Sequence, residues 1–200
     1  MDSIVLASRS PRRKEILERL NIPYIAFDID IDEKLTNVRN IKSSVMEVSK
    51  KKAAAGACHF SKGLVVGVDT VVYFNRKVLG KPENTGSAYK YIKMLSGNTH
   101  CVVSGITIRD TCGGNVYSAC SLTEVSFIKM SDSEIKNYLA ADEWKDKAGG
   151  YAIQGQAALY IKGILGSFYN VMGLPVEELY RLLKKFNYFE SRGRYQPVNK

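Results

Sequence analysis

Two kinds of apolar pattern alternate along the chain and predict a mixture of strands and helices. Continuous or alternating apolar runs predict strands over residues 3–8, 24–33, 63–75, 100–110 and 117–130. Apolar residues spaced three and four apart predict amphipathic helices over residues 11–20, 43–57, 83–98, 131–141 and 175–187. Strands and helices that interchange in this way predict one α/β domain.

Local signals mark several element boundaries. Gly113 and Gly114 separate two long predicted strands and indicate an antiparallel hairpin. Ser131 and Glu134 have the spacing of a capping box and predict a helix start. Residues 142–175, before the last helix, are glycine-rich and irregular, and a loop of this length inside a compact domain is usually functional.

The composition is that of an ordinary globular chain. Its 200 residues are 45% hydrophobic, and we predict a single domain over residues 1–186 with a polar tail over residues 187–200. No apolar run is long enough to span a membrane, and no signal-peptide pattern begins the sequence, so we expect a cytoplasmic protein. The net charge of +9 has its excess in the N-terminal half, dispersed among the predicted elements.

Cysteines and histidines leave few choices for a metal site. The four cysteines contain no C-x-x-C pair, and His59 and His100 are the two histidines, so a zinc site or a His-rich site is not expected. Any catalytic metal would need oxygen ligands, which favour Mg²⁺ or Mn²⁺. His100 begins a predicted strand and is interpreted as structural. Ser8 and Ser10 therefore lack a base and are not expected to act as nucleophiles.

The stretch LASRSPRRKEIL, residues 6–17, places cations where a helix does not favour them. Ser10 predicts the N-cap and Pro11 the first helical residue. Arg12 and Arg13 then stand in the first turn, where the helix dipole costs an exposed cation a few tenths of a kcal/mol. The free N–H groups of the helix start and the two guanidinium groups together predict a site for an anion such as phosphate.

One carboxylate lies inside a predicted buried strand. Asp69 shares a strand face with Val65, Gly67 and Val71, where an unpaired charge would be costly. Two interpretations stay open: a structural ion pair with a Lys or Arg, or a metal ligand or general base. Glu33, which ends the acidic stretch after the second predicted strand, is the carboxylate that we expect to join Asp69 at a magnesium site.

Two lysines and one amide complete the candidate residues. Lys52 lies on a predicted helix, and Lys81 is held in a turn between Gly80 and Pro82; each is either a solvated lysine or a phosphate ligand. Gln154 lies in the glycine-rich stretch KAGGYAIQG, where its amide can pair with the edge of a base. This stretch is neither a Walker A loop nor a dinucleotide fingerprint.

These segments together resemble the Maf family of nucleoside triphosphate pyrophosphatases, once described as septum-formation inhibitors. The resemblance runs from Ile4 to about Leu183 and is carried by LASRSPRR, DE at positions 32 and 33, KKAAA, VGVDTVV, LGKP, SGNTHCVVSGI, TEVSF, DKAGGYAIQG and GSFYNVMGLPVEEL. It implies an α/β fold with an elongated mixed sheet flanked by helices and two lobes around a central cleft, related to the inosine triphosphate pyrophosphatases.

The resemblance also implies an activity. The expected reaction is metal-dependent hydrolysis of a nucleoside triphosphate to the monophosphate and pyrophosphate, with water attacking the α-phosphorus. SPRR together with IQG resembles the branch that acts on thymidine and uridine triphosphates. The implied site residues are Ser8, Arg12 and Arg13 in the signature loop, Gln154 in the IQG loop, Glu33 and Asp69 as the acidic pair for Mg²⁺ or Mn²⁺, and Lys52 and Lys81 on the phosphates.

Two other classes of function stand beside the enzyme. A nucleotide-binding regulator of cell division could keep this fold without catalysis, but the intact acids and lysines favour an enzyme. A nucleic-acid-binding module would use the same positive charge, yet the sequence has no helix-turn-helix, zinc-finger or RNP-type motif. We therefore expect a nucleoside triphosphate as the partner, without a specific nucleic acid or a membrane, and a homodimer stays open.

Overall fold

The computed structural model describes residues 3–35 and 37–190. Within this part of the chain, one open seven-stranded sheet has the strand order β2-β1-β3-β5-β6-β7, with β4 paired to β3. The strands are β1 (Ile4–Ala7), β2 (Tyr24–Phe27), β3 (Leu64–Phe74), β4 (Lys77–Leu79), β5 (Thr99–Asp110), β6 (Val116–Phe127) and β7 (Ile161–Leu165). The α-helices are α1 (Pro11–Arg19), α2 (Ile41–Ala57), α3 (Thr85–Leu95), α4 (Asp132–Ala140), α5 (Phe168–Met172) and α6 (Val176–Lys184). Short 3₁₀ helices are η1 (Val38–Asn40), η2 (Ala148–Gly150) and η3 (Gln156–Tyr160).

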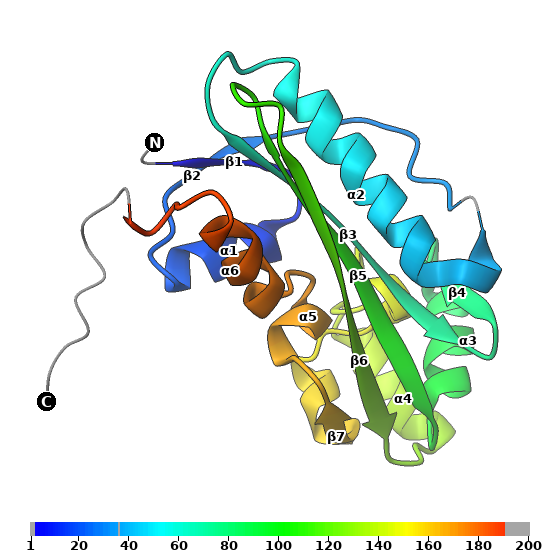
Figure 1. Ribbon diagram of the computed structural model, residues 1–200. Coiled ribbons are helices and arrows are strands. Elements are labelled where there is room, and N and C mark those ends of the chain that lie inside the picture. Colours follow the sequence, from blue (N-terminus) through cyan, green and yellow to red (C-terminus); the bar gives the residue numbers. More distant parts are fainter. Residues whose placement is uncertain (1–2, 36, 191–200) are drawn as a thin grey trace, which may run out of the picture.

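Helices cover both faces of the sheet (Figure 1). α2 packs along β3 and β5 on one face, and α1, α5 and α6 lie on the opposite face. α3 and α4 pack against each other at the end of the sheet that carries β4. The mixed sheet combines parallel pairing of β1 with β2 and β3 and antiparallel pairing elsewhere. The predicted α/β fold with an elongated mixed sheet flanked by helices is thereby confirmed.

No helix in the described ranges combines the length and the apolar character needed to cross a membrane.

The predicted elements differ from the observed ones where the elements are short. The β5–β6 hairpin turns at Gly114, whose φ is +69°, and Ser131 and Glu134 form the predicted capping box. The strand predicted to run to residue 33 ends at Phe27, because β1, its partner, is four residues long. The segment predicted to be irregular contains β7 and α5, whose five residues each are too few to show a clear period.

The chain continues to pack beyond residue 186. After α6 a turn brings Tyr188 into the core, where this residue is 2% exposed. The Lys185 ammonium lies 4.7 Å from the ring centroid of Tyr117 on β6. The predicted polar tail, residues 187–200, thus has a buried aromatic side chain at its second position, and residues 191–200 lie outside the described residues.

A gap in strand pairing along β3 creates the site. β5 pairs with one edge of β3 from Leu64 to Tyr73. On the other edge β1 pairs up to Gly67, and β4 begins to pair at Val72. Within the described ranges no strand therefore pairs with this edge at residues 68–71. The middle of β3 is thus open to a ligand between two flanking strands.

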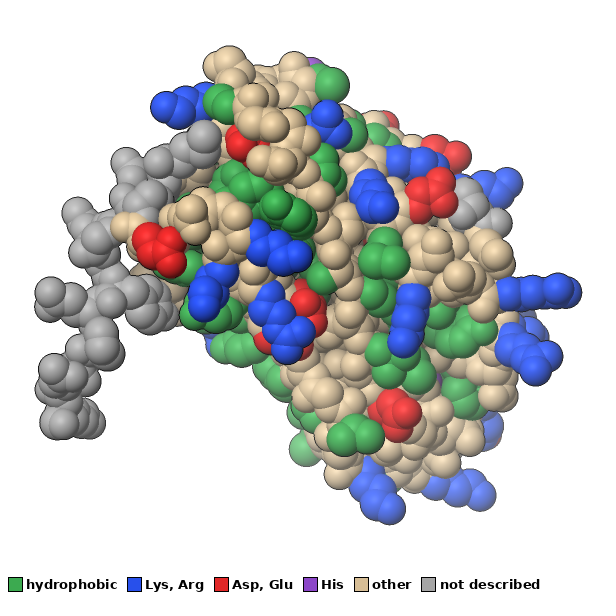
Figure 2. Space-filling model, in the orientation of Figure 1, with side chains coloured by type: hydrophobic (Ala, Val, Ile, Leu, Met, Phe, Trp, Pro, Cys, Tyr) green, Lys and Arg blue, Asp and Glu red, His purple; other side chains and the backbone are tan. Residues whose placement is uncertain are grey.

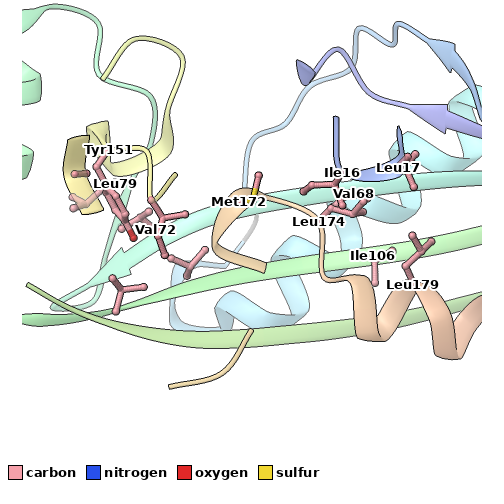
Figure 3. Close-up of a cluster of buried hydrophobic side chains, with 14 of the residues drawn as sticks. Ile16, Leu17, Val68, Val72, Leu79, Ile106, Tyr151, Met172, Leu174 and Leu179 are labelled. Carbon is pink, nitrogen blue, oxygen red and sulfur yellow. The ribbon is translucent and has the colours of Figure 1, made fainter. Parts of the chain in front are cut away.

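One apolar cluster on the α1 face follows β3 past its middle. Figure 3 shows Val68 beside Ile16 and Leu174, and Val72 farther along the strand beside Tyr151. Strand alternation places residue 70 between these two valines on the same face. A polar side chain at that position therefore leaves the apolar contacts of both valines in place.

Two glycines let α2 lie directly against the opposite face. A Cβ added at Gly67 would be 2.3 Å from the carbonyl oxygen of Ser49, and one added at Gly105 would be 2.4 Å from that of Val45. Real Cβ atoms do not approach backbone oxygens this closely, so both positions require glycine while α2 keeps its place. The close approach brings Lys52, one turn after Ser49, down onto β3.

Gly67→Ala is expected to push α2 away from the sheet and to lower the free energy of unfolding by about 2 kcal/mol or more, since the clash is with rigid backbone. Urea unfolding followed by circular dichroism measures this change. Gly163→Ala in β7 is the matched control, because its added Cβ meets nothing within 4 Å. A Gly67→Ala variant as stable as the control would contradict the close approach.

Candidate active site

A cleft opens over the unpaired stretch of β3. Its volume is about 870 Å³, within the range of small-molecule sites. Its walls come from the β1–α1 loop, the segment after β2, the β4–α3 loop, the loop before and after η2, and the end of α5. All of the residues that the sequence proposed line this cleft: Ser8, Arg12, Arg13, Glu33, Lys52, Asp69, Lys81 and Gln154.

A buried lysine joins the two predicted acidic residues. The Nζ atom of Lys52 lies 3.0 Å from Oδ1 of Asp69 and 3.1 Å from Oε1 of Glu33. The side chains of Lys52 and Asp69 are each 8% exposed, whereas that of Glu33 is 52% exposed. The ion pair required by the burial of Asp69 is therefore present, and it lies inside the cleft rather than in the core. Removing one member of such a pair would leave an uncompensated buried charge.

Arg13 holds the β1–α1 loop against the other face of β3. Its Nε donates to the carbonyl of Gly173 (2.7 Å), Nη1 donates to Oγ of Ser8 (2.8 Å), and Nη2 donates to Oγ1 of Thr70 (3.2 Å). Burial lowers the pKa of Arg13 to about 10, opposed chiefly by the charge of Asp69, so the guanidinium stays protonated at neutral pH. The sequence placed Arg13 on a phosphate; in this structure three of its N–H donors are already used within the chain.

Thr70 is a site residue that sequence reasoning missed. Its hydroxyl accepts from Arg13, lies 2.9 Å from the hydroxyl of Ser104 and 3.3 Å from the carbonyl oxygen of Gly173. A threonine in a β-rich segment gives no signal of its own, because threonine is common in strands. Thr70 directly follows Asp69 and therefore points to the opposite face of β3. This position indicates a role in the site only once the structure shows that both faces of the strand are covered.

Weakly held cations stand at the mouth of the cleft. α1 begins as predicted, with Ser10 as N-cap and Pro11 as first residue, and this start directs Arg12 toward the opening. Its two hydrogen bonds, to the carbonyls of Met172 and Asp146, are long at 3.4 and 3.5 Å. Burial lowers the pKa of Arg12, and the charge of Asp146 opposes this. Lys81, with a side chain 68% exposed, has its ammonium 3.9 Å from that same aspartate.

Positive charge dominates the lining. Lys147 also faces the cleft, and burial together with the charge of Arg12 lowers its pKa. Sequence reasoning missed Lys147, although DKAGGYAIQG contains it, because a lysine in a glycine-rich loop is indistinguishable from a solvated one until the loop is folded onto the cleft. The seven cationic lining residues are Arg9, Arg12, Arg13, Lys52, Lys81, Lys145 and Lys147, and the three acidic ones are Glu33, Asp69 and Asp146. This balance suits a polyanionic ligand.

On the face seen in Figure 2, by contrast, Lys and Arg side chains are scattered among acidic and apolar ones and do not form one continuous stripe. An extended basic surface of the kind that tracks a nucleic-acid backbone is therefore not present on that face.

The loop that carries Gln154 is fixed to the sheet by glycine. Gly149 has φ of +70°, and a Cβ there would lie 2.9 Å from Cγ2 of Val72. The N–H of Gly155 donates to the carbonyl of Ala152 and closes a turn around Gln154. Gln154 is exposed, lines the cleft, and makes no side-chain hydrogen bond within the described part of the chain. Its amide is thus available to a ligand.

His100 has the structural role expected from its sequence context. It is buried, and its Nε2 atom lies 2.7 Å from the hydroxyl of Tyr151. Burial lowers the pKa of His100 to about 4, so the ring is neutral at physiological pH. The pair anchors Tyr151, which lines the cleft and precedes the Gln154 turn.

The donor atoms of the acidic pair fit a hard divalent cation. Magnesium is commonly held by one or two carboxylates and completes its shell with water and substrate phosphate oxygens. Glu33 and Asp69 supply two such carboxylates in one cleft. Among the described residues, no group of three or more His, Cys, Asp and Glu is placed to hold a metal ion alone. The residues present therefore suit an ion whose remaining ligands come from a substrate phosphate and water.

Comparison with known proteins shows the family of this chain. The family model described as Maf-like protein matches residues 3–186. The chain is 39% identical over 186 residues to a dTTP/UTP pyrophosphatase of Clostridium perfringens, covering 92% of this chain and 97% of the relative. It is 39% identical to one from Ruminiclostridium cellulolyticum and 38% identical to one from Bacillus cereus, each covering 94% of this chain and 97% of the relative. The chain therefore belongs to the Maf family.

Proposed function

We propose that this chain hydrolyses nucleoside triphosphates, dTTP and UTP among them, to the monophosphate and pyrophosphate. The observation that carries the proposal is the pairing of buried Asp69 with Lys52 and Glu33 inside a cleft where Lys and Arg outnumber Asp and Glu. Relatives that are named dTTP/UTP pyrophosphatase, and that match this chain over nearly their whole length, support the same reaction.

In this proposal three cations that line the cleft bind the triphosphate. Arg12 and Lys81 face the cleft with long contacts of 3.4 to 3.9 Å, so phosphate oxygens can replace them. Lys147 also lines the cleft and donates to the carbonyl of Lys145 at 3.1 Å, which leaves two of its three ammonium donors for a phosphate. Gln154 pairs with the edge of the base. Ser8 and Arg13 keep the β1–α1 loop in shape, and the two remaining N–H donors of Arg13 are free to assist.

Glu33 and Asp69 are the proposed ligands of a divalent metal, and Mg²⁺ or Mn²⁺ fits two carboxylates with a phosphate. When bound, such an ion would neutralise phosphate charge and polarise the α-phosphorus. Water attacks that phosphorus, the bond to the bridging oxygen breaks, and pyrophosphate leaves. The water loses a proton, which Asp69 can accept; Asp69 thus serves as base, as metal ligand, or as both.

A nucleotide-binding division regulator without catalysis is the second candidate, and the complete set of acids and lysines in the cleft favours the enzyme. We place the activity in the cytoplasm, where the four cysteines, all free in the described structure, would stay reduced. A homodimer is retained as a further part of the proposal.

Pyrophosphate release with Mg²⁺ or Mn²⁺, measured over a panel of canonical and modified triphosphates, tests the function. We expect turnover of dTTP and UTP with release of monophosphate and pyrophosphate in equal amounts.

Asp69→Asn is expected to reduce turnover by about a thousandfold or more, because it removes a charged group at the reacting centre. Nucleotide binding without pyrophosphate release by the unaltered chain would favour the regulator, and full activity of a folded Asp69→Asn variant would exclude the proposed mechanism.

The two adjacent arginines are expected to fail in different ways. Arg12→Ala should raise KM for the triphosphate about tenfold or more with little change in stability, since it loses a charged phosphate contact. Arg13→Ala should lower the free energy of unfolding by about 2 kcal/mol or more, because it removes the three hydrogen bonds that the guanidinium donates to Ser8, Thr70 and the Gly173 carbonyl.

Initial rates and urea unfolding on the same preparations separate these effects. Arg19→Ala, an exposed residue of the same helix, is the control and should change neither quantity much. An unchanged KM in Arg12→Ala, or unaltered stability in Arg13→Ala, would show that the roles are assigned wrongly.

A further inference from the structure

The ammonium of Lys52 occupies the contact that a divalent cation would make with the acidic pair. It lies 3.0 Å from Asp69 and 3.1 Å from Glu33, on one oxygen of each carboxylate. The side chains of Lys52 and Asp69 are each only 8% exposed, so water screens the contact between them little. A metal ion that binds both carboxylates must therefore compete with a charge already in place.

The acidic pair already has cations close to it. Lys52 contacts both carboxylates, and Arg13, on the other face of β3, is close enough that both Asp69 and Glu33 raise its pKa. In a cleft lined mostly by Lys and Arg, a divalent cation on its own gains little net attraction, whereas a triphosphate brings the negative charge that makes its entry favourable.

The Lys52 ammonium can move away from the carboxylates, whereas the Arg13 guanidinium is held in place. The lysine has a flexible stem, and its ammonium already lines the cleft, so it can turn toward a phosphate while α2 stays in position. Arg13 is fixed by three hydrogen bonds from its guanidinium. The two cations of the cluster therefore differ in mobility.

We propose that Lys52 acts as a stand-in cation that keeps the acidic pair closed to divalent metal until a triphosphate enters the cleft. The ammonium then transfers from the carboxylates to the phosphates, and metal and nucleotide bind together. This inference rests on the proposed function for the identity of the nucleotide. It assigns Lys52 a positioning role toward the metal in addition to phosphate binding.

Binding of Mn²⁺, followed by electron paramagnetic resonance without nucleotide, tests the proposal independently of turnover. Lys52→Gln removes the competing charge and is expected to tighten Mn²⁺ binding by about tenfold or more. Lys50→Gln, an exposed lysine on the same helix, is the matched control and should bind Mn²⁺ as the unaltered chain does. Adding Asp69→Asn to Lys52→Gln should abolish the gain, which locates the ion at this pair.

A UTP analogue with a non-hydrolysable bridge between the α- and β-phosphates supplies the second readout. For the unaltered chain it should tighten Mn²⁺ binding strongly, and Mn²⁺ should tighten analogue binding by the same factor. In Lys52→Gln this coupling should shrink, because the metal no longer needs the nucleotide.

Folding of the variant adds a further test. If Lys52→Gln is partly unfolded, millimolar Mg²⁺ should restore its circular dichroism, since metal binding to the native state shifts the folding equilibrium. Unchanged or weaker Mn²⁺ binding in a folded Lys52→Gln variant, or failure of Mg²⁺ to restore an unfolded one, would overturn the proposal. If Lys52→Gln binds Mn²⁺ more tightly and the unaltered chain shows no pyrophosphatase activity, the role of Lys52 would be upheld and the proposed function rejected.

Discussion

The buried contact between Lys52 and Asp69 is the interaction on which the site depends. It exists because Gly67 and Gly105 allow the backbone of α2 to lie against the sheet, which carries the lysine over the open part of β3. Without that ammonium Asp69 would be a buried charge without a counterion, a situation that costs about 3–5 kcal/mol. The position of one helix, the ionisation of one aspartate and the floor of the cleft are therefore a single structural feature.

Strand alternation then extends this feature to both faces of the sheet. Asp69 points toward α2, and Thr70 points toward α1 and α5, where it meets Arg13. Because β1 ends and β4 begins on either side of these two residues, loops from both ends of the sheet converge on them. The first turn of α1 brings Arg12 and the β4–α3 loop brings Lys81, so cations from distant parts of the sequence surround the same strand segment.

Sequence patterns predicted the parts of this arrangement that are local. Long periodic helices and the β5–β6 hairpin are evident from spacing and turn residues, and Asp69 was marked by its apolar neighbours. The identity of its partner was open, because Lys52 looks like any helical lysine until α2 is packed. The burial of Arg13 and the role of Lys147 were likewise invisible, since each depends on contacts with loops far along the chain. Element boundaries and candidate charged residues can therefore be predicted from the sequence, whereas side-chain contacts that depend on tertiary packing cannot.

A double-mutant cycle on Lys52 and Asp69 tests the central claim most directly. The free energy of unfolding would be measured in urea for the unaltered chain, Lys52→Met, Asp69→Asn and the double variant. We expect the losses of unfolding free energy in the two single variants to sum to more than the loss in the double variant. The difference, the coupling energy between the two side chains, should be about 2 kcal/mol or more. Additive effects, within about 0.5 kcal/mol, would show that the buried pair does not stabilise this fold and would contradict the account.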